Sequence, residues 1–234
     1  MNQEEQENLN EQLVDASKNG DLPLIQLLFQ KGADIHTQDN KPLRLASYLG
    51  HLNIVKYLVS QGADIHGKEE EALREASGSG HLEVVKYLVE QGADIHFLND
   101  RALSFASSQG HLEVVKYLVS QGADIHANDD GSLRWTSENG NTEVVKYLLE
   151  KGADIHAKDD CALRWASEND QLEVVNYFLF DCKMKIKQET KDWLIENNCN
   201  YVLNIIEKRD LLLKLNQDII QKDSVDNLGK KVKI

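Results

Sequence analysis

The sequence lacks several features that would assign it to well-known classes of protein. Its three cysteines, Cys161, Cys182 and Cys199, form no CxxC pair, so neither a disulfide framework nor a zinc knuckle is indicated. No apolar run approaches the ~20 residues of a membrane helix. The acidic, polar start MNQEEQENLNEQ also differs from a signal peptide. We therefore expect a cytoplasmic protein with no membrane association.

Positive charge is scarce as well. The 26 lysines and arginines against 39 aspartates and glutamates give a formal net charge of −13. Since nucleic-acid binding usually depends on lysine and arginine contacts with phosphates, we expect no nucleic-acid partner, and a basic protein is the favoured partner. The sequence has no P-loop, GxGxxG, HExxH, GxSxG or kinase signature, so we expect neither an enzyme nor a cofactor.

The pentapeptide GADIH occurs five times at a spacing of 30 residues. It begins at Gly32, Gly62, Gly92, Gly122 and Gly152. A fixed period of this size indicates a repeat array, in which each unit buries its apolar face against its neighbours. In register, successive units start at Lys41, Glu71, Arg101, Gly131 and Cys161.

Each unit has the pattern of two amphipathic helices joined by a tight turn. In the third unit, Leu103 and Ala106 fall on one face of the first helix, and Val115 and Leu118 fall on one face of the second. Gly110 lies between them and lets the first helix end in the left-handed conformation. Both helices therefore have a face to bury.

These segments resemble the ankyrin repeat. GHLEVVKYLV followed by QGADIH is similar to its second helix and loop, the preceding LxxAS stretch is similar to its first helix, and the resemblance covers Leu13 to about Lys208. It implies an all-α ankyrin-repeat solenoid of stacked antiparallel helix pairs. The sequence and register of the repeats also resemble the ankyrin arrays of giant amoeba-infecting DNA viruses (mimivirus type), which implies that the protein acts in the host cell cytoplasm.

The resemblance implies a division of the chain into three parts. We expect an acidic N-terminal segment at residues 1–10, an ankyrin-repeat domain at 11–208, and a C-terminal helix and basic tail at 209–234. The domain divides into an entry cap at 11–40, five repeats at 41–190 and an exit cap at 191–208. We expect the C-terminal helix to lie over the open end of the array.

Two departures from the family pattern concern the loop before the first helix. The unit has 30 residues rather than 33, and the missing residues fall in the hairpin, so we expect shortened hairpin loops. The threonine of the family's TPLH start, which caps the first helix, is also absent. Short acceptors stand one residue earlier, and we expect them to cap the helix instead: Asn40, Glu70, Asp100, Asp130 and Asp160.

Histidine and arginine also recur with the repeat. The histidines form two sets, His36, His66, His96, His126 and His156, and His51, His81 and His111. Copies about 10 Å apart are too distant to share a metal, so we expect structural roles at turns and no metal site. For Arg74, Arg134 and Arg164 we expect ion pairs with the acidic residue four positions earlier rather than an anion site.

Candidate binding residues are those that vary between units. One position holds Leu45, Glu75, Phe105, Trp135 and Trp165. Because it accepts glutamate, we expect Phe105, Trp135 and Trp165 to be partly exposed, although packing against a neighbouring first helix remains an alternative.

Two further pairs of residues are candidates. Phe97 and Leu98 are apolar in an otherwise polar loop, which indicates either a partner contact or a local staple. Tyr48 and Leu49 occupy positions that resemble ankyrin recognition sites, or they pack near the entry cap. From these residues we expect a monomeric, non-enzymatic module that binds a protein partner, such as a basic host protein, through the concave face of the solenoid. The alternative is a substrate-recruiting adaptor for host ubiquitin ligase machinery, although no F-box is recognisable.

Overall fold

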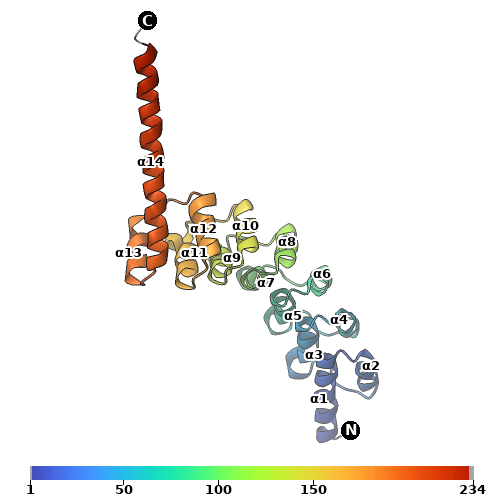
Figure 1. Cartoon of the computed structure of the whole chain (residues 1–234). Coiled ribbons are helices and arrows are strands. Elements are labelled where there is room, and N and C mark those ends of the chain that lie inside the picture. Colours follow the sequence, from blue (N-terminus) through green and yellow to red (C-terminus); the bar gives the residue numbers. More distant parts are fainter. Residues whose placement is uncertain (1, 232–234) are drawn as a thin grey trace.

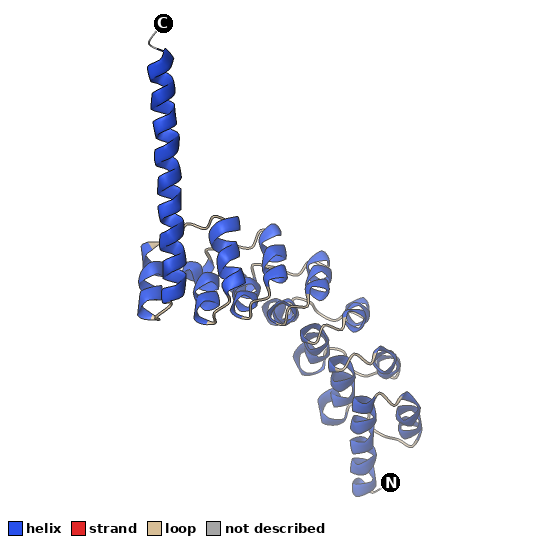
Figure 2. Cartoon of the chain, viewed as in Figure 1, coloured by secondary structure: helices blue, strands red, loops and turns tan. Residues whose placement is uncertain are grey.

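The computed structural model describes residues 2–231. Over these residues the chain forms fourteen α-helices and one π-helix and contains no strand. Figures 1 and 2 show the helices stacked in one direction as a curved array. The expected all-α solenoid is therefore confirmed.

The helices follow one another as antiparallel pairs. The first pair is α1 (Gln3–Asn19) and α2 (Leu22–Gln30). The pairs that follow are α3 (Thr37–Tyr48) with α4 (Leu52–Ser60), α5 (Gly67–Gly78) with α6 (Leu82–Glu90), α7 (Phe97–Ser108) with α8 (Leu112–Ser120), and α9 (Ala127–Glu138) with α10 (Thr142–Glu150). Next come α11 (Ala157–Glu168), α12 (Leu172–Asn176) with the π-helix η1 (Tyr177–Asp181), α13 (Gln188–Glu196) and α14 (Asn200–Lys231).

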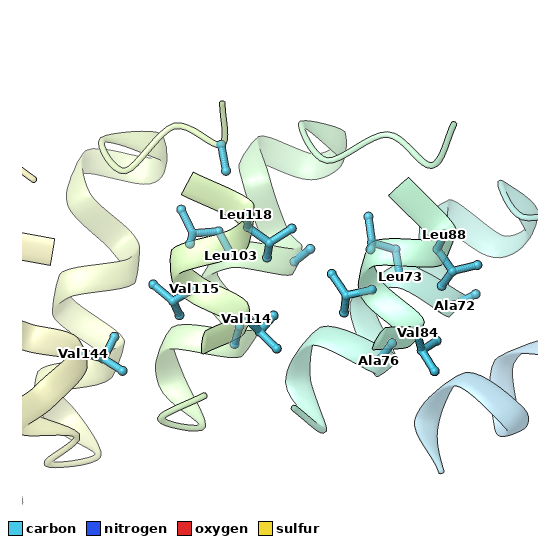
Figure 3. Close-up of a cluster of buried hydrophobic side chains, with 14 of the residues drawn as sticks. Ala72, Leu73, Ala76, Val84, Leu88, Leu103, Val114, Val115, Leu118 and Val144 are labelled. Atoms are coloured by element: carbon cyan, nitrogen blue, oxygen red, sulfur yellow. The ribbon is translucent and has the colours of Figure 1, made fainter. Parts of the chain in front are cut away.

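The core lies between two rows of helices. Figure 1 shows the odd-numbered helices α1 to α13 in an inner row on the concave side and the even-numbered helices α2 to α12 in an outer row. Leu73 and Leu103 of the inner row and Leu88 and Leu118 of the outer row are almost fully buried (Figure 3). Because these leucines recur in each unit, the core is one continuous layer along the array.

A left-handed turn replaces the hairpin between repeats. In the unit that begins with α9, Asn128, Asp129 and Asp130 have φ angles of 55°, 55° and 56°, and the helix proper starts after them. The same three-residue turn precedes the helices of α3, α5, α7 and α11. This confirms the shortened loops. Left-handed residues other than glycine cost about 1–2 kcal/mol each, so other contacts must stabilise the turn.

In four of the five turns, the asparagine or aspartate that ends the turn binds the next repeat and does not cap its own helix. Asp130 Oδ1 accepts the backbone N–H of Asp154 at 2.9 Å and lies 3.1 Å from His126 Nδ1. Asn40 and Asp100 accept the equivalent N–H groups of their next repeats. The capping expectation was wrong because the left-handed turn directs these buried side chains along the array.

Glu70 departs from this pattern. Its Oε1 lies 2.5 Å from His66 Nδ1, but its Oε2 is buried without a hydrogen-bond partner. Among the described residues, no side chain accepts a hydrogen bond from the Asp94 N–H, which is the group equivalent to the Asp154 N–H. The Glu70 carboxylate raises the pKa of His66, chiefly through this hydrogen bond. The additional methylene of glutamate therefore moves the carboxylate out of the place that aspartate fills.

The second set of histidines also joins neighbouring repeats. His81 Nε2 donates to the carbonyl oxygen of Tyr48 at 2.9 Å. Its ring lies against Gly50, where an added Cβ would come within 2.4 Å of the ring and where φ is +75°. His51 and His111 make the same kind of bond. The histidines of both sets therefore have structural contacts, and no cluster of three or more metal-ligating side chains occurs among the described residues.

Both ends of the array differ from the expected division. Helix α1 begins at Gln3, so most of the segment expected at residues 1–10 belongs to the first helix. Within it, Asn10 Oδ1 accepts the Asp34 N–H at 2.8 Å, as Asn40 does for Asp64. The entry unit therefore starts earlier than the acidic composition suggests.

At the other end, α14 continues without interruption across the boundary expected at residue 208. Its first turns pack through Val202 and Ile206, and the buried Arg209 donates to the carbonyl of Met184 at 2.9 Å. From Leu211 to Gln221 the side chains are exposed. Figure 1 shows α14 projecting away from the array, not lying over its end. The last residues of the expected basic tail, 232–234, lie outside the described residues.

Candidate partner-binding surface

Three candidate aromatic residues occupy the same position on successive inner helices. Phe105 lies on α7, Trp135 on α9 and Trp165 on α11, and all three side chains are partly exposed. The next residue on each helix, Ala106, Thr136 or Ala166, is fully buried. The aromatic residues therefore border the core without belonging to it.

Trp193 on α13 extends this set, although the sequence analysis did not single it out. The Nδ2 atoms of Asn139, Asn169 and Asn197 donate to the carbonyl oxygens of Trp135, Trp165 and Trp193, each four residues earlier, at 3.0, 3.0 and 2.8 Å. Trp193 is therefore the structural equivalent of Trp165. Its spacing of 28 residues from Trp165 breaks the 30-residue period, but the motif WxxEN, present at all three tryptophans, would have identified it.

Arginine side chains contact the rings of Trp165, Trp193 and Phe105. The guanidinium carbon of Arg134 lies 5.3 Å from the ring centroid of Trp165, and that of Arg164 lies 5.3 Å from Trp193. Arg74 and Arg101 lie 5.8 and 5.1 Å from the Phe105 centroid. Such distances are those of cation–π contacts. We call Phe105, Trp135, Trp165 and Trp193 with Arg74, Arg134 and Arg164 the arginine–aromatic column.

Two arginines of the column, Arg134 and Arg164, bind the left-handed turns of their own repeats. Arg134 donates from Nε to the carbonyl of Asp129 at 3.2 Å and from Nη2 to that of Asn128 at 2.7 Å. Arg164 donates from Nη2 to the carbonyl of Lys158 at 2.8 Å. These bonds compensate for the strained turn and fix the guanidinium groups.

The expected ion pairs of Arg74, Arg134 and Arg164 with the acidic residue four positions earlier are therefore wrong. Those residues, Glu70, Asp130 and Asp160, are buried beside the histidines of their own turns.

At the N-terminal end of the inner face, carboxylates cover the arginines. Arg44 donates to the carbonyls of Asp39 and Gln38, as Arg134 does in its own turn, but its Nη1 also pairs with Glu71 Oε2 at 2.5 Å. Arg74 Nη2 lies 3.4 Å from Glu71 and 3.8 Å from Glu75. Positive charge is thus neutralised within α3 and α5.

The structure brings Tyr48, Leu49 and Phe105 together. They line a hollow of about 630 Å³ that spans α3, α5 and α7, with Gly78 and Ser79 at the position between them. Tyr48 is 50% exposed and Leu49 is 36% exposed. An added Cβ at Gly78 would come within 3.3 Å of the Phe105 ring, so the glycine makes room for this aromatic residue.

Phe97 and Leu98 lie apart from this hollow, in the turn that begins α7. Leu98 is 45% exposed and has a φ of 50°. Together with Arg74 and Arg101, which also contact Phe105, they border a smaller recess. The seven candidate residues therefore divide among the hollow, the turn at Phe97, and the two tryptophans on α9 and α11.

The sequence comparison identifies the class of protein that this architecture defines. The family described as ankyrin repeats (3 copies) matches residues 13–99, 69–129 and 103–192. The chain therefore belongs to the ankyrin repeat family, whose repeats are protein–protein interaction modules and are generally not enzymes. Comparison with curated proteins gives no significant match. Within residues 2–231, none of the helices combines the length and apolarity needed to cross a bilayer.

Proposed function

We propose that the chain is a non-enzymatic module that binds a protein partner through the concave inner face, with the arginine–aromatic column as the anchor. The observation that carries this proposal is the partial exposure of large aromatic residues on successive inner helices. Large aromatic side chains and arginine are the residues that most often dominate binding energy at protein interfaces.

The contacts around the column support this role. Arginines contact the rings of Phe105, Trp165 and Trp193, and turn carbonyls hold Arg134 and Arg164. A surface fixed in this way loses little side-chain entropy when a partner binds. The hollow beside Tyr48 and Phe105 offers a second contact region on the same inner face.

Affinity capture with the full chain tests the proposal. The test variant is Trp135→Ala/Trp165→Ala, and the matched control is Tyr87→Ala/Tyr117→Ala, which removes two partly exposed aromatic residues from the outer helices α6 and α8. We expect a specific protein to be captured by the wild type and the control but lost with the tryptophan variant. Capture of the same protein by a tryptophan variant that melts as a folded protein would refute the proposed anchor.

A further inference from the structure

The repeats contain one arginine that pairs with an internal carboxylate and an equivalent arginine that does not. Arg44 and Arg134 bind the two turn carbonyls through Nε and Nη2 in the same way. In Arg44 the remaining nitrogen, Nη1, pairs with the carboxylate of Glu71, which lies 27 residues further along the chain. The fold therefore shows where a carboxylate sits when it binds this guanidinium.

At Arg134 that carboxylate is absent. The residue at the same separation is Cys161, which is buried and uncharged. Among the described residues, neither Arg134 nor Arg164 forms an ion pair with an acidic side chain, whereas Arg44 and Arg74 both do. Arg164 also has a buried Nε without a hydrogen-bond partner. Arg134 thus presents the geometry of Arg44 without its internal carboxylate, and Arg164 shares only the Nη2 bond to its turn.

The acidic side chains near Arg134 and Arg164 also have lysines as neighbours. Asp129, in the turn that Arg134 binds, pairs with Lys158 at 2.9 Å, and this lysine lowers the pKa of the Asp129 carboxyl. A hollow of about 320 Å³ beside Arg164 is lined by Lys187 and also by Asp159 and Glu189. These two carboxylates offset the positive charge at Arg164, so Arg134 is the stronger of the two anion-binding groups.

We propose that Arg134 and Arg164 bind carboxylate groups of an acidic segment of the partner protein, in the place that Glu71 takes beside Arg44. The inference rests on the proposed function and specifies its partner. It replaces the basic partner expected from the net charge of −13, because the charges at the column are arginines. The tryptophans contact the apolar parts of the segment, while fixed guanidinium groups form charge-assisted hydrogen bonds with its carboxylates.

The repeat spacing sets the pattern of the acidic segment. Neighbouring helices pack about 10 Å apart. A chain in the extended polyproline II conformation rises about 3.1 Å per residue and has three residues per turn, so acidic residues three positions apart lie on one face and would reach both arginines.

Fluorescence anisotropy with short labelled peptides tests this inference. The probes are an extended peptide with two glutamates three positions apart and matched peptides with glutamine or lysine in their place. We expect the full chain to bind the glutamate peptide about ten-fold or more tightly than the glutamine peptide, and the advantage should fall as salt rises. Equal binding of glutamate and glutamine peptides, tighter binding of the lysine peptide, or no binding of the glutamate peptide would overturn the proposal.

Substitutions locate the binding site. Arg134→Gln should weaken glutamate-peptide binding about ten-fold, and Arg164→Gln should weaken it less. Arg44→Gln is the matched control, since Glu71 already occupies that guanidinium. Unchanged binding by a folded Arg134→Gln variant would contradict the assignment.

A reciprocal exchange tests the site without removing either arginine. Cys161→Glu should place an internal carboxylate beside Arg134 and block the peptide, as Glu71 blocks Arg44, whereas Glu71→Gln should release Arg44 and create an additional binding site. Glu71 occupies the same position of its repeat as Cys161 does, so this position accommodates glutamate and the Cys161→Glu variant should fold. A thermal melt verifies this. A folded Cys161→Glu variant with wild-type peptide affinity would refute the proposal.

Failure of this inference can be separated from failure of the proposed function. If the captured protein is lost with Trp135→Ala/Trp165→Ala but retained with Arg134→Gln/Arg164→Gln, the column binds a partner without its carboxylates, and only this inference fails. If no protein is lost with the tryptophan variant, the proposed function fails, whatever the peptides show.

Discussion

The two ends of the inner face use the same backbone geometry for different surfaces. On α3 and α5, Arg44 and Arg74 are paired with Glu71, and the position of the tryptophans holds Leu45 and Glu75. Arg134 on α9 and Arg164 on α11 contact tryptophans of the next helix and have no acidic partner among the described residues. The recurring residues orient the guanidinium, and one variable residue, glutamate or cysteine, decides whether it is available to a partner.

The largest expected difference between the two ends is the loss of stability when the carboxylate that ends the left-handed turn is removed. Asp130→Ala leaves the Asp154 N–H without its acceptor, which should lower the free energy of unfolding by about 1–3 kcal/mol. Glu70→Ala should cost less, because Glu70 binds only the exposed ring of His66. Urea unfolding of both variants measures the difference. Equal losses would show that the bond to the next repeat contributes nothing.

Arg134→Ala should have the next largest effect on stability. It removes two hydrogen bonds to the turn and the contact with Trp165, which should cost about 1–2 kcal/mol. Among the described residues, the exposed Arg101 forms no hydrogen bond or ion pair with a side chain and has a cation–π contact with Phe105, so Arg101→Ala should cost about 0.5 kcal/mol. Thermal and urea unfolding compare the two. A larger loss at Arg101 would contradict the role of arginine in stabilising the left-handed turn.

Shortening Glu70 should bring the N-terminal end closer to the pattern of the other repeats. Glu70→Asp removes one methylene and withdraws the carboxylate, one of whose oxygens is buried without a partner, to where it can accept the Asp94 N–H, so we expect a gain of about 1 kcal/mol. Asp100→Glu is the reverse exchange and should destabilise the chain. If Glu70→Asp lowers the urea midpoint, the additional methylene is not the cause of the difference.

The smallest expected effect is on the titration of His66. The Glu70 hydrogen bond raises the pKa of His66 above its ordinary value of 6.5, so the folded state binds this proton more tightly than the unfolded state does. The resulting stabilisation is present below pH 6.5 and is lost as the pH rises through the raised pKa. Since the ring is 58% exposed, the direct measurement is NMR titration. Glu70→Gln should lower the pKa of His66, and an unchanged value would exclude the carboxylate as the cause.

Much of the fold could be predicted from the sequence. The phrase GADIH and the apolar positions around Leu103 and Leu118 repeat at a fixed period, which indicates stacked helix pairs. The column of Phe105, Trp135 and Trp165 was also identifiable, because a position that accepts Glu75 is seldom in a core. Local spacing is sufficient for such inferences, since helix faces follow from residue order.

The direction of side chains in the turns could not be predicted in the same way. Three consecutive left-handed residues direct Asp130 toward the next repeat and leave the turn carbonyls to Arg134. Spacing of four residues on a regular helix would instead have paired these two side chains. The correct partners depend on a backbone conformation that residues other than glycine rarely adopt.

The end of the array shows the same limit. The apolar residues from Leu211 to Ile219 predicted a helix, and α14 includes them, but it projects from the array beyond the bond between Arg209 and Met184. Trp193 was overlooked because the linker before α13 changes the repeat length. Both cases depend on contacts between segments whose separation in the sequence is not periodic.

Intrinsic tryptophan fluorescence tests the central claim most directly, because the only three tryptophans of the chain are Trp135, Trp165 and Trp193. Titration of the unlabelled glutamate peptide, or of a captured partner that lacks tryptophan, therefore reports only on the arginine–aromatic column. The account predicts a saturable change in emission with the same dissociation constant as the anisotropy measurement. It also predicts that Arg134→Gln weakens both signals together. Complex formation detected by anisotropy without any change in tryptophan emission would place the partner elsewhere and contradict the account.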